Sequence, residues 1–404
     1  MTKPLAGIRV LDLGQFIAAP GAGQIMREMG ADVVKIEPLQ GDWTRSSRDF
    51  GEPMLRAHNR GKRSIALDLR ATGSRNVMVE LLRHADVLLH NMRPGAMASL
   101  GYSAAEVAQI NPCVVYASVS GFGPAGPSSM RSGLDIAAQA ESGLMSITGE
   151  AGGLPLRVGT TIVDAATAHA LTEGVLASLL CRERTGTAVP VEVSLLDVAV
   201  HLQAADVARF GVGGEMPQRR GNGQPGAAPA ADLIKTSDGY VVLSGYSTTH
   251  WPKLCALLGH PEFADDPRYR DNEQRVLHRH ELIADLSSAL EGLSSDECVA
   301  LLAPHGIVIG AVRDYAQVLE AADIIDNRTV VEGIADDGSS YLTPRTPTRF
   351  AGTVPEAAGL RVPRLGEHTR EILAEVGLSN DQVDQLESAG VIGSDLAPAQ
   401  LVMQ

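Results

Sequence analysis

The fold is decided by the stretch Ile8-Arg-Val-Leu-Asp-Leu13, Gly14-Gln-Phe-Ile-Ala-Ala-Pro20-Gly21-Ala-Gly23 and, after a helical segment, Asp32-Val-Val-Lys-Ile36. Two short apolar runs separated by a glycine-bearing loop and a helix are typical of a βαβ unit. The acidic Glu37 after the second run resembles the acidic residue of a dinucleotide-binding fold. Met26, however, stands where the third glycine of that fingerprint belongs. We therefore predict an α/β fold and no NAD site.

Further along the chain the same alternation continues. Val87-Leu-Leu-His90 and Val114-Val-Tyr-Ala-Ser118 are typical of buried strands, and residues 77–84 and 104–110 have helical spacing. Alternating strands and helices predict an open, mostly parallel sheet, whose ligands gather at the carboxyl ends of the strands. The loops that follow the predicted strands should then share one face, and they are at Gly14, 37–45, 91–95 and 121–127.

Length and composition indicate more than one domain. The chain has 404 residues, 44% of them hydrophobic, which is more than one typical domain holds. Glycine, proline and alanine dominate around residues 210–231, after which strands and helices resume in another order. We predict a large domain over 1–205, a glycine-rich linker or lid over 206–225, a smaller α+β domain over 226–325, and a C-terminal segment over 326–404.

Charge and cysteine content exclude several classes of function. The net charge is −14 and the pI is about 5.2, so nucleic acid is not an expected partner, and an anionic ligand would need local basic clusters. The four cysteines have no metal-ligand or redox spacing, so we expect neither a metal site nor disulfides. No signal segment or long apolar run is present, and we expect a cytoplasmic protein with no membrane partner.

Asp164 stands at the start of a predicted buried helix. It closes the segment Arg157-Val-Gly-Thr-Thr-Ile-Val-Asp164, and apolar residues at helical spacing follow until Gly186. Aspartate is a common N-cap residue, and a cap needs no chemistry. The same place suits a nucleophile, because a helix N-terminus favours the ionised carboxylate that attacks. The pattern alone leaves both interpretations open.

A basic cluster is concentrated between residues 42 and 63. The turn Asn59-Arg-Gly61-Lys-Arg63 precedes an apolar strand, a geometry suited to binding phosphates. Charge runs also commonly form a solvated surface, so this interpretation competes with the first. The cluster consists of Arg45, Arg48, Arg56, Arg60, Lys62 and Arg63.

The ordered motifs of the chain resemble the class III coenzyme A (CoA) transferases, a family that includes formyl-CoA transferase, the carnitine-CoA transferase and the 2-methylacyl-CoA racemases. The likeness covers nearly the whole sequence. The motifs that carry it are Gly30-Ala-Asp-Val-Val-Lys-Ile-Glu37, Lys62-Arg-Ser-Ile-Ala-Leu-Asp68, Asn91-Met-Arg-Pro-Gly95, Ser120-Gly-Phe-Gly-Pro124, Asp164, Arg182-Glu-Arg-Thr-Gly186 and Leu365-Gly-Glu-His368.

The resemblance implies a fold, an assembly and a set of site residues. It implies an interlocked homodimer with a Rossmann-like large domain, to which the C-terminal segment returns, and a smaller α+β domain. It places Asp164 at the acyl group of a bound acyl-CoA. CoA would be bound by Arg45, Lys62, Arg63, Asn91 and Arg93. The same likeness makes Gly221 and Gly223 candidates for a mobile lid, while Gly121 and Gly123 are candidates for an oxyanion site from the placement of their loop alone.

The activity implied by the resemblance is transfer of CoA from an acyl-CoA to a small carboxylic acid, with no metal and no NAD. Asp164 would form an anhydride and then an aspartyl-CoA thioester. The alternative is a racemase, which needs a second proton-transfer group where this chain has Leu134. Ile17 and Pro38 replace a glutamine and an arginine of formyl-CoA transferase, which argues against formate and oxalate as the acids exchanged.

Overall fold

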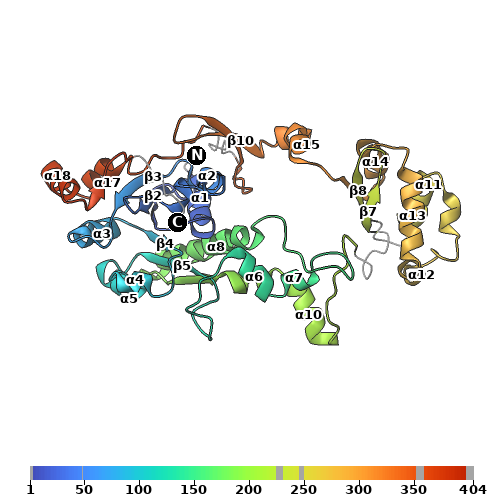
Figure 1. Ribbon diagram of the computed structural model, residues 1–404, viewed down its shortest axis with the longest axis horizontal. Coiled ribbons are helices and arrows are strands. Elements are labelled where there is room, and N and C mark those ends of the chain that lie inside the picture. The colour runs from blue at the N-terminus through green and yellow to red at the C-terminus, as the bar shows by residue number, and fades with distance from the viewer. Residues whose placement is uncertain (1–2, 48, 224–230, 245–249, 352–358, 397–404) are drawn as a thin grey trace. The chain divides into compact units, whose positions relative to one another are not determined.

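The computed structural model describes residues 3–47, 49–223, 231–244, 250–351 and 359–396 (Figure 1). The chain divides into two compact units. The first unit comprises Met1–Leu144, Arg157–Glu215 and Asp326–Gln404, and the second comprises Met145–Leu156 and Met216–Ile325.

A seven-stranded sheet forms the centre of the first unit. Its strands are β1 (Arg9–Asp12), β2 (Asp32–Glu37), β3 (Arg63–Leu67), β4 (Val87–His90), β5 (Val115–Ser120), β6 (Val191–Ser194) and β12 (Ile392–Gly393), in the order β12-β3-β2-β1-β4-β5-β6. All neighbours are parallel except β12, which pairs antiparallel with β3. The predicted mostly parallel α/β sheet is thus confirmed. Strand order reverses between β1 and β4, the place where such sheets bind ligands.

Helices cover both faces of this sheet (Figure 1). On one face α3 (Ser74–Arg83), α5 (Ala104–Ile110), α17 (Thr369–Glu375) and α18 (Asn380–Ser388) enclose one apolar core. On the other face α1 (Ala18–Glu28), α8 (Ile162–Thr185) and α9 (Leu195–His201) enclose a second. The remaining elements of the first unit are η1 (Trp43–Arg45), α2 (Gly51–Asn59), α4 (Ala96–Ser99), α6 (Asp135–Glu141), α10 (Ala204–Gly213), β10 (Val330–Ile334) and β11 (Ser340–Pro344).

The close contact between α1 and α8 depends on a glycine. A Cβ atom at Gly21 would lie 2.9 Å from the Cβ of Ala168, so only glycine lets the two helices approach this closely. At its other end α8 stops at Gly186, whose φ of 77° is the left-handed conformation that favours glycine. This packing holds the N-terminus of α8 on the sheet face shared with α1.

The second unit has its own core. Its sheet is antiparallel, with β7 (Asp232–Lys235) and β9 (Val308–Ala311) on either side of β8 (Tyr240–Ser244). Trp251, Leu254 and Leu286 are among the buried residues between sheet and helices. The helices are α11 (His250–Leu257), η2 (Pro261–Ala264), α12 (Asn272–Leu277), α13 (Arg279–Leu290), α14 (Ser295–Leu302), η3 (Ala303–His305) and α15 (Tyr315–Glu320), while α7 (Leu144–Ile147) and α16 (Ala322–Asp326) cross the unit boundaries.

Two details differ from the predicted boundaries. The linker predicted over 206–225 is wrong in its first part, because the helix formers that precede the glycines fold as α10, which ends before Gly214. Residues 145–156 also belong to the second unit, which the prediction assigned to 226–325 alone. Across the described residues, every helix is too short or too polar to span a bilayer.

Candidate active site

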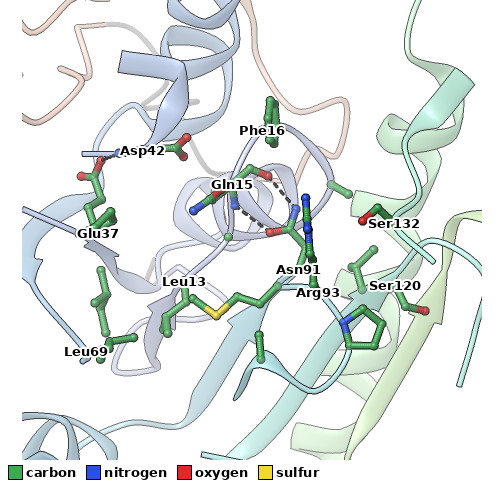
Figure 2. Close-up of a pocket in the computed structure, with 18 of the residues that line it drawn as sticks. Leu13, Gln15, Phe16, Glu37, Asp42, Leu69, Asn91, Arg93, Ser120 and Ser132 are labelled. Carbon is green, nitrogen blue, oxygen red and sulfur yellow. Dashed lines mark hydrogen bonds between the residues drawn. The ribbon is translucent and has the colours of Figure 1, made fainter. Parts of the chain in front are cut away.

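A cavity of about 840 Å³ opens at the carboxyl ends of the parallel strands in the first unit (Figure 2). Its walls come from the loops that follow β1, β2, β4 and β5, and they include Gly14, Pro38, Asn91 and Gly121. The prediction that these loops share one face is therefore confirmed. The N-terminus of α8 completes the wall with Asp164.

Two loops are joined across the point where strand order reverses. The side chain of Asn91 accepts a hydrogen bond from Gln15 N at 2.8 Å and donates one to Gln15 O at 2.7 Å (Figure 2). Both ends of the amide are thus occupied by backbone. Asn91 lines the cavity as predicted, but its amide fixes a loop and is not free for CoA. Phe16, the residue after Gln15, has a φ of 61°, and its ring centroid lies 5.3 Å from that of Trp43.

Asp164 is the third residue of α8 and is half-buried. Among the described residues, none donates a hydrogen bond to its carboxylate. Burial and, to a smaller extent, the negative charge of Asp135 together raise the pKa of Asp164 to about 7. A carboxyl group of this kind is partly protonated at neutral pH, and its ionised form is unusually basic.

The capping interpretation of Asp164 is wrong, because another carboxylate performs that role. Asp135 Oδ2 accepts hydrogen bonds from Val163 N at 2.8 Å and Asp164 N at 3.2 Å. Its Oδ1 accepts one from Gln139 Nε2 at 2.5 Å, and Gln139 Oε1 accepts one from Val158 N at 2.9 Å. Asp135 is only 5% exposed. Sequence reasoning missed it, since the cap lies 29 residues away from the helix that it serves.

The phosphate-binding role of Lys62 stays a prediction, and the structure shows its side chain fully buried and already paired. Lys62 Nζ lies 2.7 Å from Asp12 Oδ2 and donates further hydrogen bonds to Asn59 Oδ1 and Pro20 O, each at 2.9 Å. Desolvation lowers the pKa of Lys62 to about 8, and the negative charge of Asp12 opposes this shift. Lys62 is absent from the cavity wall.

Arg45 and Arg63 are also engaged by carboxylates and do not line the cavity. Arg45 forms a two-point ion pair with Glu37, with its Nε 2.7 Å from Oε1, and both side chains are 1% exposed. Arg63 lies 2.5 Å from Asp32 Oδ2 and 2.8 Å from Glu375 Oε1. Their contact with CoA, like that of Lys62, stays a prediction, and it would require these ion pairs to open or to be shared. Arg48 of the basic cluster falls outside the described residues.

Three arginines with exposed side chains line the cavity, and one of them, Arg131, is paired with Glu141, which leaves two others. Arg93 follows β4, as predicted, and Arg70 follows β3. Among the described residues, no carboxylate forms an ion pair with either guanidinium. Sequence reasoning missed Arg70, although its position just after a parallel strand was the available signal. These two arginines, in place of Arg45, Lys62 and Arg63, have the charge and access that an anionic ligand requires.

The predicted glycines separate into three cases. Gly121 lines the cavity, and its backbone packs so tightly on Gly133 that a Cβ would lie 2.6 Å from Gly133 Cα. Gly123 is not in the wall, and its N–H donates to Ser120 Oγ at 3.1 Å, so it is not a free oxyanion donor. Gly221 and Gly223 belong to the second unit, and their lid role stays a prediction.

No cluster of three or more potential metal-ligating side chains exists within the described ranges. The cavity wall instead combines apolar side chains, unpaired arginines and one carboxylate without a hydrogen-bond donor. Such a wall suits an anionic ligand with an uncharged reactive end.

Comparisons with known proteins agree with this geometry. The sequence model described as CoA-transferase family III matches residues 5–369. A probable fatty acyl-CoA transferase of Mycobacterium tuberculosis is 34% identical over 392 residues, covering 92% of this chain and 98% of that protein. A succinate–glutarate CoA-transferase of Agrobacterium fabrum is 32% identical, covering 92% and 96%. The crystal structure of a CaiB/BaiF family protein from Brucella suis superposes with a TM-score of 0.83 at 31% identity, covering 93% and 100%.

Proposed function

This chain belongs to CoA-transferase family III and is a CoA-transferase, and we propose that Asp164 is the nucleophile that carries CoA from an acyl-CoA donor to a free carboxylic acid. The observation that carries this proposal is a basic, half-buried carboxylate in the cavity wall at the carboxyl edge of the sheet. Carboxylates that act as nucleophiles form covalent intermediates which divide one difficult transfer into easier steps.

The chemistry balances with Asp164 as the one covalent carrier. Its carboxylate attacks the thioester carbonyl carbon of the donor, which breaks the C–S bond and gives a mixed anhydride and CoA thiolate. The thiolate attacks the Asp164 carbonyl carbon, releases the donor acid and leaves an aspartyl-CoA thioester. An incoming carboxylate attacks that thioester to give a second anhydride and the thiolate. The thiolate then attacks the new acyl carbon, forming the product and restoring Asp164.

The cavity is long enough to separate the nucleotide end of CoA from the acyl end. Arg70 follows β3, whereas Ser120 ends β5 and Gly121 follows it, and β5 is four strands away from β3 in the sheet order. Four strand spacings amount to about 19 Å. We assign the phosphates of CoA to Arg70 and Arg93, and the thioester to the end beside Asp164.

The environment of Asp164 fits both the attack and the need to exclude water. Ile17, Leu134 and Leu195 contribute apolar side chains to the wall that contains Asp164. Activated acyl groups hydrolyse if water reaches them, and apolar walls limit that reaction. Leu134 has no titratable group, so it supplies no second acid or base for racemisation.

Hydroxylamine trapping tests the assignment. Incubation with acyl-CoA and hydroxylamine should convert Asp164 to a hydroxamate, seen by mass spectrometry of the peptide. Asp164→Asn should lose the label and reduce transfer by roughly a thousandfold or more. Asp68→Asn, which removes another carboxylate from the cavity wall, is the matched control and should keep the label. Transfer by Asp164→Asn at the wild-type rate would refute the proposal.

A further inference from the structure

Beyond the nucleophile itself, the first turn of α8 carries an unusual arrangement of two carboxylates. The backbone N–H groups at a helix N-terminus normally stabilise a nearby carboxylate. Here Asp135 of α6 takes the N–H groups of Val163 and Asp164. Asp164, on the helix itself, is left without a hydrogen-bond donor among the described residues.

We infer that Asp135, held by Gln139, is a positioning residue that fixes the first turn of α8 and keeps the Asp164 carboxylate basic enough to attack a thioester. This inference rests on the proposed function, because it assigns a partner to the nucleophile proposed there. Two separate effects follow from the geometry: hydrogen bonds hold the backbone in place, and a negative charge acts on Asp164.

The backbone is held in place by a chain of linked hydrogen bonds. Val158 N binds Gln139 Oε1, Gln139 Nε2 binds Asp135 Oδ1, and Asp135 Oδ2 binds the first turn of α8. Gln139 is 0% exposed and Asp135 is 5% exposed, so water does not compete with these bonds. The chain fixes both sides of the loop from which α8 begins, and so fixes the backbone that carries Asp164.

The electrostatic effect comes from the charge of Asp135. A second negative charge close to Asp164 disfavours its ionisation, and burial weakens the screening of that repulsion. The helix dipole is also partly neutralised by Asp135 and is less available to Asp164. A carboxylate that is harder to form is a stronger base, and therefore a stronger nucleophile once it has formed.

The other ionisable groups on the elements packed against α8 do not account for the raised pKa of Asp164. The elements packed against α8 are α1, α6, α9, β5 and β6. Their ionisable side chains, with those of the first half of α8, are Arg27, Glu28, Tyr116, Asp135, Glu141, Glu192, Asp197, His201, His169 and Glu173. Of these, Asp135 is the one whose charge raises the pKa of Asp164. Glu141 is paired with Arg131, and Asp197 accepts a hydrogen bond from Ser194.

The test separates the two effects with two substitutions at Asp135. Asp135→Asn keeps one oxygen to cap α8 and removes the charge, and asparagine is a good cap. Its NH2 group takes the place of the oxygen that accepts from Gln139 Nε2, so Gln139→Leu serves as the control for that lost bond. The kcat of Asp135→Asn at high pH, where Asp164 is ionised in both proteins, should fall by about twofold, because a less basic carboxylate is a weaker nucleophile. The acidic limb of the pH profile of kcat/KM should shift to lower pH by about one unit. At pH values below the wild-type limb, this shift is about a tenfold gain in activity relative to the maximum. Asp135→Ala removes the cap as well, and kcat should fall by about tenfold or more with the KM for acyl-CoA unchanged.

Asp197→Asn is the matched control. It removes an aspartate that accepts a hydrogen bond from Ser194, the N-cap of α9. The acidic limb of the pH profile of kcat/KM should stay where it is in the wild type. If Asp135→Ala fails to fold, Gln139→Leu frees Asp135 from its anchor while keeping the charge. Its kcat should then fall severalfold, with no downward movement of the limb.

The outcomes distinguish this inference from the proposed function. An acidic limb that does not move in Asp135→Asn, with kcat also retained in Asp135→Ala, would reduce Asp135 to an ordinary cap and overturn the inference. Asp164 would remain the nucleophile in that case, provided that Asp164→Asn is inactive. Full transfer by Asp164→Asn would overturn the proposed function and the inference together.

Discussion

Two regions of the first unit hold buried or half-buried charges at the same edge of the sheet, and they treat those charges in opposite ways. Near β1–β3, Lys62 pairs with Asp12, Lys35 with Asp42, and Arg45 with Glu37. Near β5 and α8, Asp135 is the charged group that shifts the pKa of Asp164, and no cation in the described part of the chain offsets it. In the first region the charges cancel in pairs, and in the second a single charge is left uncompensated.

The difference teaches which charges serve the fold and which serve the chemistry. Paired buried charges are satisfied and inert, as shown by the pKa of Glu37: burial alone would raise it, but Arg45 lowers it to about 2. An uncompensated carboxylate in a cavity is costly to keep, and perturbed groups of this kind cluster at functional sites. The paired cations therefore stabilise the fold, and the aspartate without a counter-charge is the one that we propose as the nucleophile.

Breaking a buried ion pair of the first region should have the largest effect, a loss of folding stability. Lys62→Met would leave the carboxylate of Asp12, which is 0% exposed, without its ammonium partner. We expect a loss of about 3–5 kcal/mol in the free energy of unfolding, because one half of a buried ion pair remains in an apolar setting. Urea denaturation followed by circular dichroism measures this loss.

The matched double variant sharpens that prediction. Asp12→Asn in combination with Lys62→Met removes both charges and keeps an oxygen for the bond from Gly14 N, which Asp12 Oδ1 accepts at 2.8 Å. Much of the lost stability should return, since no charge is then left uncompensated. A loss of less than about 1 kcal/mol in Lys62→Met alone would contradict the view that the pair is structural.

The sequence was sufficient for the sheet and for the loops around the cavity. Strands such as β4 are buried on both faces, and helices such as α5 have clear periodicity, so their patterns identify them without knowledge of tertiary contacts. Because the loops at the carboxyl ends of parallel strands share one edge of the sheet, the strand pattern alone predicts that Gly14, Asn91 and Gly121 lie on one face.

The partners of charged side chains could not be predicted in the same way. Arg63 contacts Glu375 across 312 positions, and Asp135 caps a helix 29 positions away. Local sequence contains no signal for such long-range pairs, and a basic motif looks the same whether its cations bind phosphate or carboxylate. The sequence therefore identified Asp164 correctly as a cavity residue, but assigned the paired cations to CoA and overlooked Arg70.

A smaller effect should separate the free cations from the paired ones. Arg93→Ala removes an exposed guanidinium in the cavity wall, and we expect the KM for acyl-CoA to rise about tenfold, with little change in kcat. The rise should shrink at high salt, since the contact is a screened one. Arg63→Ala is the control, and its KM should stay within about twofold because Arg63 faces Asp32 and Glu375. Equal KM values for both variants would contradict the assignment.

The smallest effect concerns stability and tests directly whether the charge of Asp164 is uncompensated. The pKa of this carboxyl is about 7 in the folded chain, against an ordinary value of 3.8. Between these two values the folded chain retains a proton that the unfolded chain has released. Stability should therefore fall as pH rises through this window, and it should level off above pH 7.

Asp164→Asn removes the ionisation and should be more stable than wild type at pH 8 by about 1–2 kcal/mol, after allowing for partial exposure. The gap should become small at about pH 4, where the carboxyl group is protonated in the folded chain and about two fifths protonated in the unfolded one. Parallel urea titrations of both proteins at the two pH values measure the gap. A wild type that is the more stable at pH 8 would show that Asp164 is stabilised by a partner, and the contrast between the two regions would not hold.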